Sequence, residues 1–61
     1  MIKRIKVEFV EGVHLPRFKM NKGATWEVRP DRLTINGFAL GGGFVKNSDF
    51  KIIGIIRWGT S

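Results

Sequence analysis

The sequence predicts an all-β protein in which five short strands form a small barrel. Apolar and polar residues alternate with a period of two along several stretches, which is typical of half-buried strands. No stretch has a sustained helical period, and β-branched residues crowd the extended segments. Five short strands in 61 residues need a strongly bent sheet, and we expect residues 1–61 to form a single domain.

The first strand is centred on Ile5, Val7 and Phe9, which alternate with charged residues. Residues 11–22 contain a proline and run into a turn signal, so we expect a long irregular loop there. A second strand follows at residues 24–29. It ends at the next residue, a proline, which has no N–H to donate to a neighbouring strand.

The middle of the chain predicts two further short strands around a tight turn. One strand covers residues 33–35, and the dipeptide Asn36-Gly37 tolerates the positive φ angles of a hairpin turn. Residues 38–40 resume extended structure. The three glycines at 41–43 then predict a bulge, a bend or a close backbone approach. A polar turn at residues 46–49 leads into the last strand.

Two segments resemble SH3 domains. Residues 43–53 (GFVKNSDFKII) are similar to the end of that fold, where a glycine and a hydrophobic pair lead into a short 3₁₀ turn and a last strand. Residues 20–28 (MNKGATWEV) resemble the start of its second strand after a long first loop. The resemblance covers most of the chain from Val7 to Ile53. It implies a five-stranded SH3-like barrel with a long first loop.

The groove by which SH3 domains bind proline-rich peptides is not present in its usual form. The chain has Arg32-Leu33 where the family has a tryptophan, and Lys46 and Asp49 where the family has a proline and a tyrosine. It contains no tyrosine. The resemblance therefore implies the fold without the peptide groove. Similar barrels in bacteria, archaea and their viruses often bind nucleic acid or other proteins.

The composition argues against an enzyme and against a metal site. The absence of cysteine excludes thiolate zinc sites, iron–sulfur clusters and disulfides. The five acidic residues lie beside basic residues or in turns, and His14 is the only histidine. A pair of titratable groups in a pocket, which acid–base catalysis needs, is not indicated. We therefore expect no catalytic residues, no cofactor, no metal and no small-molecule substrate.

The sequence also gives no sign of a membrane or export signal. Residues 1–6 are followed by no apolar stretch of signal-peptide length. The longest apolar run, residues 52–56, is far shorter than the ~20 residues that span a bilayer. We expect a cytoplasmic protein that does not bind membranes.

Positive charge is the strongest functional signal. The chain has eleven lysines and arginines and five acidic residues, which gives a net charge of +6. Such an excess favours binding to nucleic-acid phosphates, and the alternative is that it only keeps a small protein soluble. The sequence does not distinguish DNA from RNA. The candidate nucleic-acid-binding residues are Lys3, Arg4, Lys6, Arg17, Phe18, Lys19, Lys22 and Arg29.

Three aromatic residues decide whether bases could stack on the surface. Trp26 alternates in phase with Ala24 and Val28, which favours a place in the core. Phe18, between two cations in the long loop, and Trp58, near the end of the chain, are candidates for exposed rings.

The last strand, residues 50–58, is apolar on both faces and needs a cover. A second copy of the chain, the N-terminal Ile2 or a partner protein would each provide one. The candidate protein-interface residues are Ile53, Ile55 and Trp58. The rival function is therefore a protein-interaction module, such as an accessory factor of a bacterium or a bacteriophage.

Overall fold

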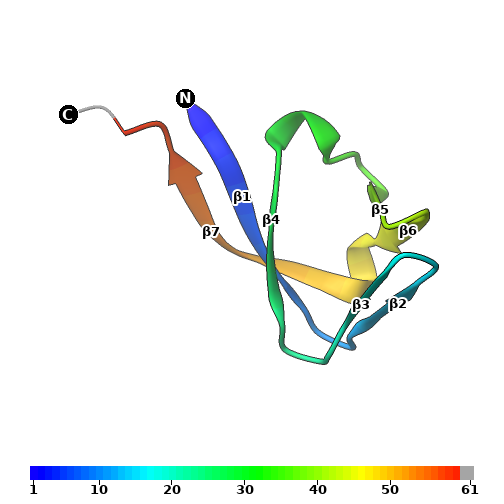
Figure 1. The fold of residues 1–61 in the computed structure, drawn as a ribbon. Helices are drawn as coiled ribbons and strands as arrows, with labels where there is room; N and C mark the ends of the chain where they lie inside the picture. The colour runs from blue at the N-terminus through cyan, green and yellow to red at the C-terminus, as the bar shows by residue number, and fades with distance from the viewer. Residues whose placement is uncertain (60–61) are drawn as a thin grey trace.

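The computed structural model describes residues 1–59, and this part of the chain is all-β, with two short 3₁₀ turns (Figure 1). None of its helical segments is long or apolar enough to span a bilayer. The strands are β1 (Ile2–Phe9), β2 (Val13–Leu15), β3 (Phe18–Met20), β4 (Thr25–Val28), β5 (Gly37–Leu40), β6 (Gly43–Lys46) and β7 (Phe50–Arg57). The 3₁₀ turns are η1 (Pro30–Arg32) and η2 (Asn47–Asp49).

The two longest strands, β1 and β7, pair antiparallel and form the central element of the fold. They pair from Ile2 with Arg57 to Phe9 with Phe50, and Figure 1 shows the start of β1 beside the end of β7. β4 pairs antiparallel with the other edge of β1, so the main sheet has the order β4-β1-β7. β2–β3 and β5–β6 form two separate hairpins. Among the described residues, these three sheets do not close into one hydrogen-bonded barrel.

The core lies at one end of the β1–β7 pair, which we call the ribbon. Its buried residues come from six strands: Val7, Phe9, Val13, Val28, Phe38, Val45 and Phe50. Phe38 and Phe50 meet edge to face, with ring centroids 5.0 Å apart. The other end of the ribbon extends past the core, which explains an elongated shape of 39 × 20 × 19 Å.

The long first loop predicted for residues 11–22 is wrong, because most of it is the β2–β3 hairpin. Val13 pairs with Met20, and Leu15 pairs with Phe18 across a two-residue turn. Each strand has only three residues, which is too short for an alternation to stand out in the sequence. The hairpin supplies two strands that were not predicted, and the structure has seven strands in the described residues instead of five.

The prediction of a strand at residues 33–35 is also wrong. Only an isolated bridge joins Thr34 to Gly37. The Thr34 hydroxyl donates to the carbonyl oxygen of Gly37 at 2.8 Å and accepts from the N–H of Asn36 at 3.2 Å. These local bonds make a turn centred on Ile35 and Asn36, and Gly37 becomes the first residue of β5.

The remaining elements agree with the sequence prediction. The first and last strands, the strand after residue 24 and the extended segment at 38–40 are all present. The polar turn at 46–49 contains the 3₁₀ turn η2. The close approach predicted at the three glycines is confirmed, since a Cβ on Gly43 would lie 2.7 Å from Cδ2 of Leu15. The N–H of Arg17 also donates to the carbonyl of Gly41 at 2.8 Å, so the tips of the two hairpins are bonded.

Gly37→Ala should lower the free energy of unfolding by about 1–3 kcal/mol. Gly37 has a φ of +135°, and a Cβ there would collide with the carbonyl oxygen of Val45. Chemical denaturation followed by circular dichroism measures the loss. Gly54→Ala is the matched control, because its Cβ would lie 3.8 Å from the Cβ of Lys6, an ordinary contact. Equal losses at the two positions would contradict this account.

Candidate functional site

β4 is an edge strand, and this position determines what it exposes. It bonds to β1 on one side and to no strand on the other within residues 1–59. Trp26 stands opposite the buried Val7 and so belongs to the core side of the sheet, as its phase predicts. Because no strand of the described residues pairs with the outer edge, Trp26 keeps 39% of its residue surface exposed. The prediction of Trp26 as a core residue is therefore only partly met.

The Trp26 ring packs on Phe18, which in turn packs on Phe9. The rings of Trp26 and Phe18 meet edge to face, with centroids 4.7 Å apart. Phe18 in turn meets the fully buried Phe9 at 6.1 Å. Phe18 is half-buried and packs on the core. The expectation of an exposed Phe18 ring that contacts nucleic acid is thus not supported by its position, and Trp26 is the exposed ring of this group.

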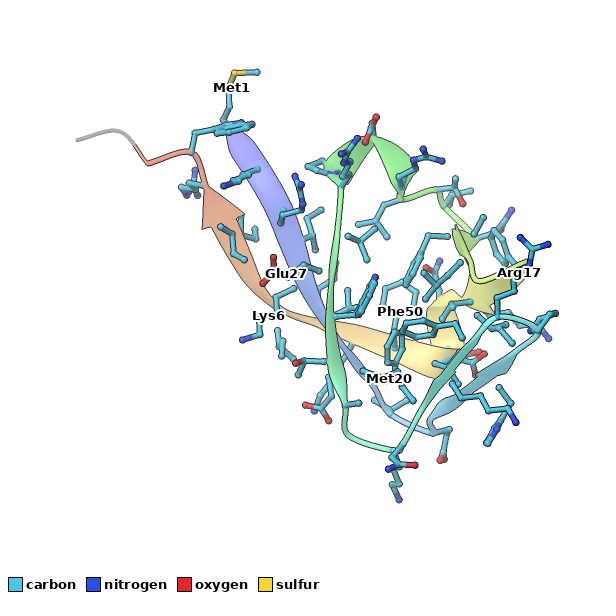
Figure 2. The ribbon with its side chains drawn as sticks, viewed as in Figure 1. Met1, Lys6, Arg17, Met20, Glu27 and Phe50 are labelled. Carbon is cyan, nitrogen blue, oxygen red and sulfur yellow. The ribbon has the colours of Figure 1, made fainter. Side chains whose placement is uncertain are left out.

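A hollow of about 440 Å³ lies at the junction of β1 and β4. Arg4 and Lys6 line it from β1, and Thr25, Trp26 and Glu27 line it from β4. Lys6 is the cross-strand neighbour of Glu27. Figure 2 shows both of these side chains on the left of β4, away from Phe50 in the core. We call this space the outer hollow.

A second hollow of about 150 Å³ lies along the free edge of β4. It is bounded by Trp26 and Glu27, by Arg29 and Arg32 near the turn η1, and by residues 38–40 of β5. We call this space the edge hollow. Trp26 and Glu27 line both hollows, and their side chains lie on opposite faces of β4, Trp26 with Val7 and Glu27 with Lys6. Together the two hollows make a candidate site with four cations, one carboxylate and one exposed aromatic ring.

The eight predicted nucleic-acid residues are not gathered on one surface. Arg4 and Lys6 line the outer hollow, and Arg29 lines the edge hollow. Arg17 lies at the tip of the β2–β3 hairpin, and Figure 2 places it on the opposite side of Phe50 from Lys6. The same hairpin carries Phe18 and Lys19, and Lys22 lies in the connection from the hairpin to β4.

Lys3 belongs to a third place, the end of the ribbon. Its Nζ lies 5.2 Å from the centroid of the Trp58 ring. A cation over an aromatic face is attracted by the ring, so Lys3 and Trp58 are held together there. Sequence reasoning missed Arg32, which lines the edge hollow. The proline after residue 29 marks the end of β4, but the sequence gives no sign that Arg32 lies beside the free edge of that strand.

The positive charge of the surface is largely unpaired. Within residues 1–59, the only ion pair is that of Lys51 Nζ with Glu8 Oε2, at 4.0 Å. An exposed pair of this kind contributes roughly 0–1 kcal/mol. The cations of the two hollows therefore have no carboxylate within 4.0 Å in the described part of the chain.

The described residues contain no cluster of three His, Asp or Glu side chains that could hold a metal ion. His14 is exposed on β2, opposite Lys19. No buried side-chain nitrogen or oxygen in residues 1–59 lacks a hydrogen-bond partner.

The second candidate region is the free edge of β7. Three residues of this region, Ile53, Ile55 and Trp58, are 43%, 49% and 52% exposed. The register with β1 shifts at Ile53, which forms an irregularity between the pairs Lys6–Gly54 and Val7–Ile52. The N–H of Trp58 donates to the carbonyl of Met1 at 3.2 Å. This strand therefore carries a strip of exposed apolar side chains beside an unpaired backbone edge.

The chain matches no protein-family model, no curated protein and no solved structure. The functional conclusion therefore rests on the geometry and the charge of the two hollows and of β7.

Phe18→Ala should destabilise the protein by about 1–3 kcal/mol, since it removes the ring between Phe9 and Trp26. Thermal or chemical unfolding measures this. Lys19→Ala, at the next and exposed position, is the control and should change stability by less than about 0.5 kcal/mol. A Phe18→Ala protein as stable as the control would show that the ring has no structural role.

Proposed function

We propose that this chain is a non-enzymatic module that binds nucleic acid through its backbone phosphates, using the two hollows beside β4. The observation that carries the proposal is the placement of Arg4, Lys6, Arg29 and Arg32 around these two hollows. Glu27 is the one carboxylate lining them among the described residues. A cytoplasmic location, where nucleic acid is present, is part of this proposal.

Charge supplies the affinity in this mechanism. Lysine and arginine attract phosphates, and binding releases the counterions condensed on the nucleic acid. The net charge of +6 adds a long-range attraction that speeds encounter. The site contains no α-helix that could enter a major groove, within the residues described. Low sequence specificity follows, because phosphate contacts carry no direct sequence information.

We also propose that the fold is an open relative of the SH3-like barrel. Two features support this. The 3₁₀ turn η2 directly precedes the last strand, and the long first connection, now a hairpin, separates β1 from β4. The missing pairing between β4 and β5 is where the edge hollow lies. The relationship concerns the fold and adds nothing to the choice of ligand.

Neutralising the hollow cations should weaken binding and reduce its dependence on salt. For Arg4→Gln and Lys6→Gln, the slope of log affinity against log salt should fall by about 0.7–0.9 per lost phosphate contact. Fluorescence anisotropy of a labelled oligonucleotide between about 50 and 200 mM salt measures it. Lys19→Gln, which removes the same charge from the β2–β3 hairpin, is the matched control and should leave the slope unchanged.

Glu27→Gln tests the same mechanism in the opposite direction. Removing the carboxylate next to Lys6 should raise the affinity, because the repulsion of phosphates in both hollows is lost. Affinity that does not change with salt, or equal effects of Lys6→Gln and Lys19→Gln, would refute phosphate binding at this site.

A second candidate function is a protein interface on β7. The exposed side chains of Ile53, Ile55 and Trp58 and the free strand edge favour it. An unpaired edge can accept another strand, and a second copy of this chain carries the same edge. Size-exclusion chromatography with light scattering should then give a dimer that Ile55→Lys converts to a monomer. A monomer at all concentrations would remove self-association and leave only a different partner protein.

A further inference from the structure

We infer that Trp26 is a stacking site for a base of single-stranded nucleic acid. This inference rests on the proposed function and goes further, because it specifies the ligand as single-stranded and assigns a role to an uncharged residue. Three observations carry it: the exposure of Trp26, the support of its ring by Phe18, and the edge hollow beside it, which Arg29 and Arg32 also line.

The exposure of Trp26 follows from the fold. Its cross-strand neighbour is the fully buried Val7, so the Trp26 side chain projects from the core face of the sheet. It reaches the surface only because β4 has no neighbour on its outer edge. An exposed tryptophan at a strand edge offers a large apolar area to a ligand and loses little conformational freedom on binding.

The ring is also held in place before any ligand arrives. Phe9 is buried, Phe18 packs edge to face on Phe9, and Trp26 packs edge to face on Phe18. This column of rings runs from the core to the surface. A ring that is already fixed needs less ordering when a base stacks on it, and preorganisation of this kind increases affinity.

The edge hollow provides positions for the phosphates that flank the base. It is lined by Trp26 together with Arg29 and Arg32. Lys6 and Glu27, which line the outer hollow, lie on the opposite face of the sheet from the Trp26 side chain. A strand whose base lies on Trp26 would have Arg29 and Arg32 available for its phosphates.

The exposed ring favours a single strand over a duplex. In a duplex the faces of the bases are covered by their neighbours, and unstacking a base costs a few kcal/mol. The site therefore fits a single strand, whose bases are free to stack on aromatic rings.

Trp58 does not fit this role equally well. Its ring is exposed, but the ammonium of Lys3 lies 5.2 Å from its centroid, and Trp58 lines neither the outer hollow nor the edge hollow. Trp58 is useful as an internal control. The protein has two tryptophans, so replacing either one leaves a single fluorescent indole in a known place.

The experiment titrates the Trp58→Phe and Trp26→Phe proteins with oligo-dT, with oligo-U and with a DNA duplex of the same length. In Trp58→Phe, where Trp26 is the only indole, both single strands should quench the fluorescence and the duplex should not. In Trp26→Phe, where Trp58 is the only indole, quenching should be absent. The oligo-dT and oligo-U arms show whether the strand bound more tightly is DNA or RNA.

Affinities provide a second readout. Trp26→Leu should weaken single-strand binding by about tenfold or more, while duplex affinity and the salt slope stay as they are. Leucine keeps an apolar side chain over Phe18, and a thermal melt confirms that the variant is folded. Salt-dependent binding without quenching of Trp26, or equal quenching of both indoles, overturns the stacking site and leaves phosphate binding intact. No binding of any oligonucleotide at low salt overturns both proposals.

Discussion

The structure depends on the pairing of β1 with two partners at once. β1 is the middle strand of the β4-β1-β7 sheet, and it supplies Val7 and Phe9, two of the most deeply buried side chains. The hairpins β2–β3 and β5–β6 cover the face that these residues present. In a core of seven buried side chains, each large ring matters, since burying one contributes roughly 1.5–3 kcal/mol.

The same sheet explains where ligands can bind. With β1 in the centre, β4 and β7 become edges, and each edge exposes aromatic or apolar side chains that would be covered in a closed barrel. On β4 these side chains lie among arginines and lysines, and on β7 they lie in a strip of isoleucines. The two edges therefore suit different partners. Charge favours a polyanion at β4, whereas the strip on β7 suits an apolar surface.

The sequence predicts the fold well where an element is long enough to show its period. The alternation around Val7 and the run after Phe50 identify β1 and β7, and the proline after residue 29 marks the end of β4. The β2–β3 hairpin escapes prediction because three residues show no usable alternation. The supposed strand at 33–35 fails because the Thr34 hydroxyl bonds to its own turn. Local side-chain bonds of this kind compete with strand pairing.

The candidate site was less accessible to prediction than the fold. The sequence identifies which residues are cationic, but their grouping depends on how the strands and turns meet in space. Lys6 lies on the first strand and Arg17 follows it closely in the sequence, yet the core separates the two side chains in space. Arg32 reaches the site through the turn η1. The phase of Trp26 gives its side of the sheet, but its exposure depends on a neighbouring strand that is missing.

The pairing of β1 with β7 also governs how the chain acquires its structure during synthesis. The residues that pair, such as Phe9 with Phe50, are joined by a long intervening segment, whereas each hairpin closes within a few residues. Closing the long segment carries the larger entropic penalty and is the slower event. On the ribosome, β1 emerges first and must wait for β7. Until then its apolar side chains are exposed, and the charges of Lys3, Arg4 and Lys6 protect the nascent segment from aggregation.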